Sequence, residues 1–186
     1  MEILPIKTKV IKTGDNLARI ILDSIYNQGI EIKNGDIIAI SSKVISTTTK
    51  RIINLKKIKP SNKAQELAKK YSLEPEFVEL ILKECEKIYG GVKKAILTLK
   101  NGILTVNAGV DHKNAPKGYA SLWPMNPQLE ADKLRKEIEE ATGRKIGVLI
   151  VDSEVSPLRL GTRGLALAVS GFRPVIDYRG RKDLCC

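Results

Sequence analysis

Apolar residues recur at helical spacing in four parts of the chain and predict four helices. The first carries Leu17, Ile21 and Ile25 on one face, with Thr13 or Asp15 as its cap and a glycine as its stop. The next two begin near prolines, and the second of these is expected to run to a double glycine. The predicted helices cover residues 13–29, 60–73, 74–91 and 127–143.

Shorter apolar runs bounded by polar or turn residues predict strands. The clearest is a hairpin, AILTLKNGILTV, whose Asn101-Gly102 pair is preferred in a type I′ turn. The most apolar is KIGVLIVDS, which ends in Asp152 and Ser153. The predicted strands cover residues 2–6, 35–43, 51–55, 95–106, 145–153 and 174–178, with the Thr-rich 46–50 as a connection and 114–127 as an irregular loop.

This order of elements predicts the fold class. Strands are separated in some places by a hairpin and in others by helices, which favours a mixed α/β or α+β fold over a regular doubly wound sheet. No GxGxxG follows the first strand and no Walker A sequence occurs, so neither a Rossmann nor a P-loop fold is supported. The 186 residues form one domain or two small intertwined lobes, without an internal repeat or a clear boundary.

The composition of the chain indicates which classes of binding partner are favoured. Lys and Arg number 32 against 21 acids, giving a formal charge of +11 that favours nucleotides, phosphorylated metabolites, nucleic acid or acidic peptides. Part of this basicity is equally well explained by the composition of a thermophile with an AT-rich genome. The three cysteines, Cys85, Cys185 and Cys186, form neither a disulfide framework nor a zinc motif. No signal peptide and no run long enough to cross a bilayer is present, so we expect a cytoplasmic protein that does not enter membranes.

Two apolar strands end in carboxylates, at Asp111 after ILTVNAGV and at Asp152-Ser153 after VLIV. Strand ends can aim oxygen ligands at a shared point, and Mg²⁺ or Mn²⁺ binds one or two carboxylates together with phosphate oxygens. The pair therefore indicates a metal site. The alternative is that Asp111 caps a turn and Asp152 caps a helix or an Asx-turn.

Other polar residues are weaker candidates. His112, beside Asp111, is the chain's single histidine and is better explained as an exposed loop residue. Ser41, Ser42 and Lys43 follow a strand as phosphate-binding loops do, but without a glycine-rich signature. Basic residues spaced by glycines could contact an anion or form a solvated basic surface; these are Arg159, Arg163, Arg179, Arg181 and Lys182.

Several motifs in order, LPIK, GDNLA, GDIIAISSKVIS, NAGVDHKN, EEATGRKIGVLIVDS, PLRLGTRG and DYRGRKDL, resemble the coenzyme F420 gamma-glutamyl ligase family over nearly the whole chain. The resemblance implies a mixed α/β fold that forms an intertwined homodimer. It also implies the addition of L-glutamate, through a gamma linkage, to the deazaflavin coenzyme precursor, with GTP and by way of an acyl phosphate.

The resemblance also implies roles for individual residues. Asp111, Asp152 and Ser153 would hold Mg²⁺ or Mn²⁺ against the GTP phosphates, with K⁺ as a further candidate cation. Ser42, Lys43 and Asn114 would contact the nucleotide. Substrate anions would meet Arg159, Arg179, Arg181 and Lys182.

Some positions depart from the family pattern. Thr47, Ser156 and Leu158 stand where relatives usually carry a lysine, an arginine and an aromatic residue, and the segment 8–11 does not match. The family also continues beyond RGRKDL, so we expect its C-terminal part to be absent here. An amide-bond-forming ligase is the first hypothesis, and a paralogue that binds a nucleotide or another phosphorylated anion without ligation is the second. A nucleic-acid binder is disfavoured because interleaved aromatics and a helix-turn-helix pattern are missing.

Overall fold

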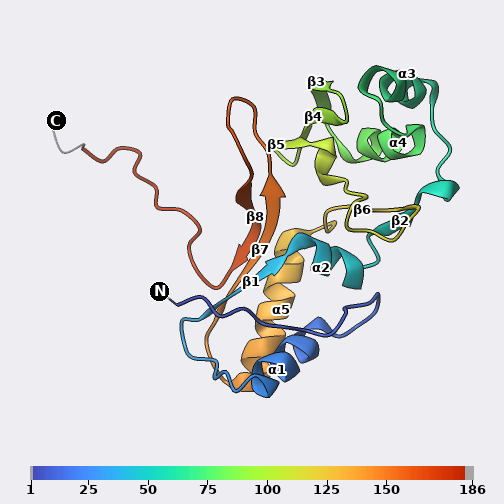
Figure 1. Cartoon of the computed structure of the whole chain (residues 1–186). Coiled ribbons are helices and arrows are strands. Elements are labelled where there is room, and N and C mark those ends of the chain that lie inside the picture. The colour runs from blue at the N-terminus through green and yellow to red at the C-terminus, as the bar shows by residue number, and fades with distance from the viewer. Residues whose placement is uncertain (1, 183–186) are drawn as a thin grey trace.

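The computed structural model describes residues 2–182 and has a mixed α+β architecture, as the sequence predicts (Figure 1). Cys185 and Cys186 lie outside the described residues. Within residues 2–182, the strands form small separate sheets rather than one continuous sheet. The buried apolar side chains fall into two clusters, here called the first core and the second core.

The first core lies under a sheet of order β1-β7-β8. Strands β1 and β7 are parallel, with Ile37 opposite Gly147 and Ser41 opposite Val151, and β8 is antiparallel to β7. Helices α1 and α5 pack below this sheet (Figure 1), where Ile21, Ile138 and Ile150 are buried. The elements are α1 (Leu17–Asn27), β1 (Ile37–Ser41), α2 (Ser42–Thr48), α5 (Pro127–Thr142), β7 (Gly147–Glu154) and β8 (Arg163–Ser170).

The second core joins a helix pair to an antiparallel sheet of order β3-β4-β5 and to the short pair β2-β6. Phe77, Val78 and Ile81 of α4 are buried against Ile96 of β4 and Ala120 of β6. The elements are β2 (Ile52–Asn54), η1 (Leu55–Lys57), α3 (Asn62–Tyr71), α4 (Pro75–Glu84), β3 (Lys87–Val92), β4 (Ala95–Lys100), β5 (Ile103–Val106), η2 (Asn107–Gly109) and β6 (Tyr119–Ser121).

Most predicted elements are confirmed. The hairpin β4-β5 turns at Asn101 and Gly102, whose φ angles of 51° and 73° match the type I′ expectation. Helix α1 forms as predicted, but its cap is Asn16, whose side chain accepts the NH of Arg19 at 2.9 Å. The expected caps Thr13 and Asp15 were therefore wrong. Asp15 instead closes the preceding turn by accepting the NH of Lys12.

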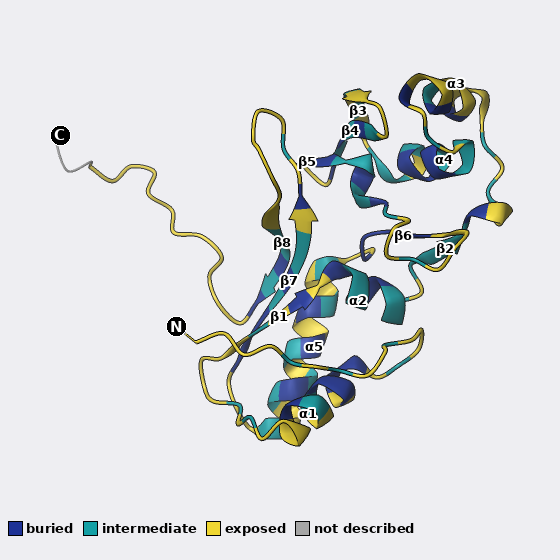
Figure 2. Ribbon diagram, in the orientation of Figure 1, coloured by how far each residue is buried: buried dark blue, intermediate teal, exposed yellow. Residues whose placement is uncertain are grey.

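Two predicted strands were wrong. Residues 2–6 and 174–178 have no strand partner among the described residues and remain largely exposed (Figure 2). Both segments are apolar enough to resemble strands, but a strand also needs a neighbour to satisfy its backbone groups. The apolar character of these segments does not show whether a partner strand is present.

Helix α4 is shorter than predicted because the chain becomes extended at Cys85, with φ −100° and ψ 149°. The segment KIYGGV then forms β3, whose first residue, Lys87, pairs with Leu99 of β4. The predicted connection 46–50 was also partly wrong, since α2 runs through Thr48. Finally, β6 forms inside the predicted irregular loop because β2 pairs with it.

The two cores approach each other where α2, which follows β1, contacts β6 (Figure 1). The junction between the cores contains Lys43, Asp111 and Asp152, which the sequence singled out.

Within the described part of the chain, no helix is both long and apolar enough for a membrane crossing.

Candidate functional site

The register of the parallel pair β1-β7 brings Lys43 to Asp152. Because Ser41, the last residue of β1, lies opposite Val151, the start of α2 lies beside Asp152, which continues β7 opposite Leu165 of β8. Lys43 is in the first turn of α2, and its Nζ donates to Asp152 Oδ1 at 3.0 Å. Residues 109 positions apart thus meet because β1 and β7 pair in this register.

Asp111 reaches the same place from the second core through a left-handed turn. Asn107, Ala108 and Gly109 have φ angles of 54°, 53° and 69°, a conformation that residues other than glycine rarely adopt. The turn is stabilised where the NH of Ala108 donates to Thr98 Oγ1 at 2.8 Å and where Asn107 Oδ1 accepts the NH of Ile96. Such strain is held by surrounding contacts and is common at functional sites.

The ammonium of Lys43 bridges the two carboxylates. Its Nζ lies 3.0 Å from Asp152 Oδ1 and 3.5 Å from Asp111 Oδ2. The side chain of Asp152 is 9% exposed, and those of Asp111 and Lys43 are 25% and 29% exposed. One cation therefore already contacts an oxygen from each core at a partly shielded position.

Asp111 caps the turn that follows it, as one interpretation of the sequence expected, and it also faces Lys43. Its Oδ1 accepts the NH of Lys113 at 2.7 Å, which forms an Asx-turn. Its Oδ2 accepts from Asn114 Nδ2 at 2.8 Å and faces Lys43. Burial raises the pKa of this carboxyl, but the NH of Lys113, the Asn114 amide and Lys43 outweigh burial and lower its pKa below the ordinary value.

Asp152 lies within β7, opposite Leu165 of β8. The alternative prediction, that Asp152 caps a helix or an Asx-turn, was therefore wrong. Besides Lys43, its Oδ1 accepts the NH of Ser153 at 2.9 Å. Its Oδ2 accepts a short hydrogen bond from the indole Nε1 of Trp123. Sequence reasoning placed Trp123 in an irregular loop and missed this contact.

A partly buried charge cluster of Arg51, Glu84 and Lys100 lies beside Trp123. Glu84 accepts from Arg51 at 2.8 and 2.9 Å and from Lys100 Nζ at 2.6 Å. Burial raises the pKa of Glu84, yet the two cations lower it below its ordinary value. Burial also lowers the pKa of Lys100, although Glu84 opposes this effect. The three side chains form one interdependent ionic group.

The remaining candidates for nucleotide contact differ in position. Asn114 is exposed beside Asp111, and Ser153 is exposed next to Asp152. Ser42 is buried at 1% exposure, and its carbonyl accepts the hydroxyl of Ser46 at 2.8 Å within α2. Their nucleotide and metal roles remain predictions.

The basic candidates of the C-terminal part lie outside this arrangement. Arg159 is exposed between β7 and β8, and Lys182 is exposed at the end of the described chain. Arg179 pairs with Asp177 at 2.7 Å, while the Arg181 guanidinium lies 4.9 Å from the ring centre of Tyr178. Figure 2 shows this segment exposed along its length. Their proposed contact with substrate anions stays a prediction.

His112 is exposed, as predicted, and its ring contacts Phe77 edge to face, with ring centres 4.7 Å apart. It donates to neither carboxylate among the hydrogen bonds of residues 2–182. The histidine beside Asp111 therefore packs on the second core.

The donor set suits a hard divalent cation. Among residues 2–182, no group of three His, Cys, Asp or Glu side chains could hold a metal alone. Two carboxylates that already share the Lys43 cation, with the Ser153 hydroxyl nearby in sequence, match Mg²⁺ or Mn²⁺ when phosphate oxygens supply the other ligands. The residues therefore fit a metal that arrives with a nucleotide.

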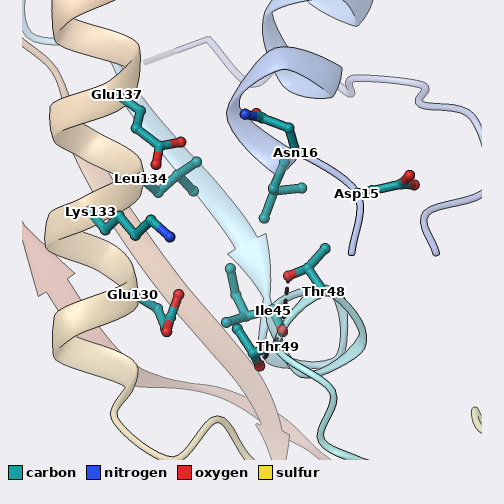
Figure 3. A pocket seen from close by; sticks show the side chains of 10 residues that line it. Asp15, Asn16, Ile45, Thr48, Thr49, Glu130, Lys133, Leu134 and Glu137 are labelled. Atoms are coloured by element: carbon teal, nitrogen blue, oxygen red, sulfur yellow. Dashed lines mark hydrogen bonds between the residues drawn. The ribbon is translucent and has the colours of Figure 1, made fainter. Parts of the chain in front are cut away.

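Two partly open pockets lie away from the carboxylate pair. One, of about 150 Å³, opens between α1, α2 and α5 and is lined by Asp15, Thr48, Glu130, Lys133 and Glu137 among others (Figure 3). Another, of about 620 Å³, lies between α1 and the extended segment that precedes it, including Lys7 and Lys9. Neither of these two pockets is lined by Asp111, Asp152 or Lys43.

Comparison with known proteins shows the family of the chain. The family model described as F420-0:Gamma-glutamyl ligase matches residues 5–186. A coenzyme F420:L-glutamate ligase of Methanocaldococcus jannaschii is 40% identical over 185 residues, covering 99% of this chain and 72% of the relative. The ligase of the same name from Methanopyrus kandleri is 37% identical, covering 99% and 71%. The chain belongs to the F420-0:gamma-glutamyl ligase family.

Proposed function

We propose that this chain adds L-glutamate to the deazaflavin coenzyme F420 precursor in a reaction driven by GTP and a divalent metal. The observation that carries the proposal is the convergence of Asp111 and Asp152 on one cation, Lys43, from two separate cores. The names of the relatives support glutamate and coenzyme F420 chemistry. GTP and metal rest on the resemblance together with the donor set.

In this proposal each residue has a defined task. Asp111 and Asp152 offer one outward oxygen each, and Ser153 a hydroxyl, to Mg²⁺ or Mn²⁺, which would neutralise phosphate charge during phosphoryl transfer. Lys43 leaves its carboxylate partners and contacts a phosphate oxygen when the metal takes those partners. Asn114, held beside Asp111 by its hydrogen bond, is placed to contact the nucleotide.

The proposed chemistry proceeds in two balanced steps. A carboxylate oxygen of the coenzyme precursor attacks the γ-phosphorus of GTP, and the bond to the β-γ bridging oxygen breaks to release GDP. The amine of L-glutamate then attacks the resulting acyl phosphate, inorganic phosphate leaves, and the amine loses a proton. The protein positions the reactants and stabilises developing negative charge.

The direct test is turnover by the purified protein. Incubation with GTP, Mn²⁺, L-glutamate and the precursor is expected to release GDP and to increase the product mass by one glutamyl unit. Omission of glutamate should abolish the mass gain. No GDP release and no product, with intact GTP binding, would contradict ligation and favour the non-catalytic paralogue.

Association into a homodimer, which the resemblance implies, remains part of the proposal. Sedimentation velocity of the purified chain, with and without Mn²⁺ and GTP, would test it. A species with the mass of one chain at micromolar concentration under both conditions would contradict it.

A further inference from the structure

The two oxygens of Asp152 have different partners. Oδ1 accepts from Lys43 and from the NH of Ser153 on the side that faces Asp111. Oδ2 accepts from the indole of Trp123, which directly follows Leu122 of the second core. The carboxylate is therefore held through both oxygens, and Oδ1 is the one that shares the Lys43 ammonium with Asp111.

Trp123 itself is tightly held. Its side chain is 4% exposed, and its ring packs so closely on Gly109 that a Cβ there would lie 2.3 Å from the indole. The carbonyl of Trp123 accepts from Arg51 Nε at 3.0 Å, and Lys100 Nζ lies 5.3 Å from the ring centre. Arg51 and Lys100 are in turn held by Glu84. The partly buried charge cluster thus contacts both the backbone and the ring of Trp123.

We propose that Trp123 is a positioning residue that orients Asp152 for metal binding by occupying its Oδ2. This inference rests on the proposed function, because it assigns Asp152 to the metal. An indole NH is suited to the task because it only donates, carries no charge and has few rotatable bonds. Without it, Oδ2 could turn toward Lys43, which would then compete for both oxygens.

Under this proposal, the Arg51–Glu84–Lys100 cluster serves to hold Trp123 in place. A buried ionic group seldom adds net stability compared with apolar packing, so its presence calls for another explanation. Here two of its members contact Trp123 and the third holds them. Groups that orient a metal ligand commonly change metal affinity by roughly 10- to 100-fold when removed.

The contact can be tested without any metal. The chain has a single tryptophan, so a ¹H–¹⁵N spectrum contains one indole NH peak. Donation to a carboxylate should place this peak downfield, and Asp152→Asn should move it upfield. A peak that is unchanged in Asp152→Asn would overturn the proposal, whether or not the protein binds GTP.

The effect on metal binding is tested with Trp123→Phe, which keeps an aromatic ring but removes the NH. The Mn²⁺ dissociation constant, measured by electron paramagnetic resonance in the presence of GTP, should rise roughly 10- to 100-fold. Tyr71→Phe, at another buried aromatic residue of the second core, is the matched control and should leave the constant unchanged. Equal affinities in wild type and a folded Trp123→Phe variant would overturn the positioning role.

Other outcomes are also decisive. If wild type binds no Mn²⁺ with GTP, the proposed function fails, and the indole peak still decides whether the contact exists. If Trp123→Phe does not fold, the wild-type peak is followed during titration with Mg²⁺ and GTP. A shift at saturation supports coupling between Trp123 and the metal site, and an unmoved peak at saturation contradicts it.

Discussion

Lys43 and Arg179 are both cations paired with an aspartate, but the two pairs differ in how the fold holds them. Lys43 joins carboxylates from two cores, and its side chain is 29% exposed. Arg179 pairs with Asp177, two residues away, and is 91% exposed. The first pair depends on tertiary structure, whereas the second can form within a short segment. A charged side chain is held in a fixed orientation where separate elements of the fold contact it.

The largest effect should follow from neutralising a junction carboxylate. Asp152→Asn keeps the shape of the side chain but removes the charge offered to the metal, so GTP-dependent Mn²⁺ binding should fall by more than about 100-fold. Calorimetric titration with Mn²⁺ in the presence of GTP measures this loss. Asp23→Asn, at an exposed residue of α1 paired loosely with Arg19, is the control. Equal affinities in the two variants would contradict the assignment of Asp152.

Breaking the partly buried charge cluster should destabilise the second core. Glu84→Gln leaves Arg51 and Lys100 without a carboxylate, at a cost of about 3 kcal/mol in the free energy of unfolding. Urea denaturation followed by circular dichroism measures it. Glu140→Gln, whose surface pair with Lys136 is 3.8 Å long, should change stability by less than about 0.5 kcal/mol.

Glu84 also predicts a dependence of stability on pH. Its folded pKa lies below the ordinary value of 4.5, because pairing with Lys100 and Arg51 outweighs burial. The carboxylate therefore contributes stability that is fully present above pH 4.5 and is lost as pH falls through the lower folded pKa. In urea titrations at successive pH values, Glu84→Gln should lose less stability than wild type over this acidic window. Parallel losses in the two proteins would contradict this source of acid sensitivity.

Removing Lys43 should separate metal binding from nucleotide binding. In Lys43→Met, Mn²⁺ alone should bind more tightly because the ammonium no longer competes for the carboxylates. GTP should bind about tenfold more weakly because a charge-assisted hydrogen bond to phosphate is lost. Lys136→Met on the exposed face of α5 is the control. A parallel loss of both affinities would show that Lys43 only stabilises the junction.

The smallest effect is expected in the C-terminal segment. Arg179→Ala removes a local, exposed pair and should change Mn²⁺–GTP affinity by less than about twofold. The same calorimetric titration measures it, with Arg19→Ala on α1 as a control for lost surface charge. A loss as large as that of Lys43→Met would place this segment at the junction and remove the contrast between the two regions.

Local patterns predicted the helices and the hairpin well, because Asn101-Gly102 and the spacing of Leu17, Ile21 and Ile25 act over short distances. Partners distant in sequence were harder to predict. The segment 174–178 resembles a strand but has no strand partner among residues 2–182, whereas KIYGGV resembles a helix end but pairs with β4. Whether such a segment forms a strand depends both on its intrinsic propensity and on the presence of a partner strand.

The same reasoning applies to the candidate site. The paired strand ends indicated Asp111 and Asp152, and the structure brings both to Lys43. The contact of Trp123 with Asp152 could not be predicted, because it requires the register of two cores and the left-handed turn at Asn107–Gly109. A lone tryptophan inside a polar, proline-rich loop was the available signal for a buried anchor there.

The central claim is that Asp111 and Asp152 together hold a divalent cation that arrives with GTP. The most direct test is Mn²⁺ binding measured by electron paramagnetic resonance with GTP in wild type, Asp111→Asn and Asp152→Asn. We predict one Mn²⁺-GTP complex bound by wild type and a loss of more than about 100-fold in each variant. Wild-type affinity in both variants would contradict the claim.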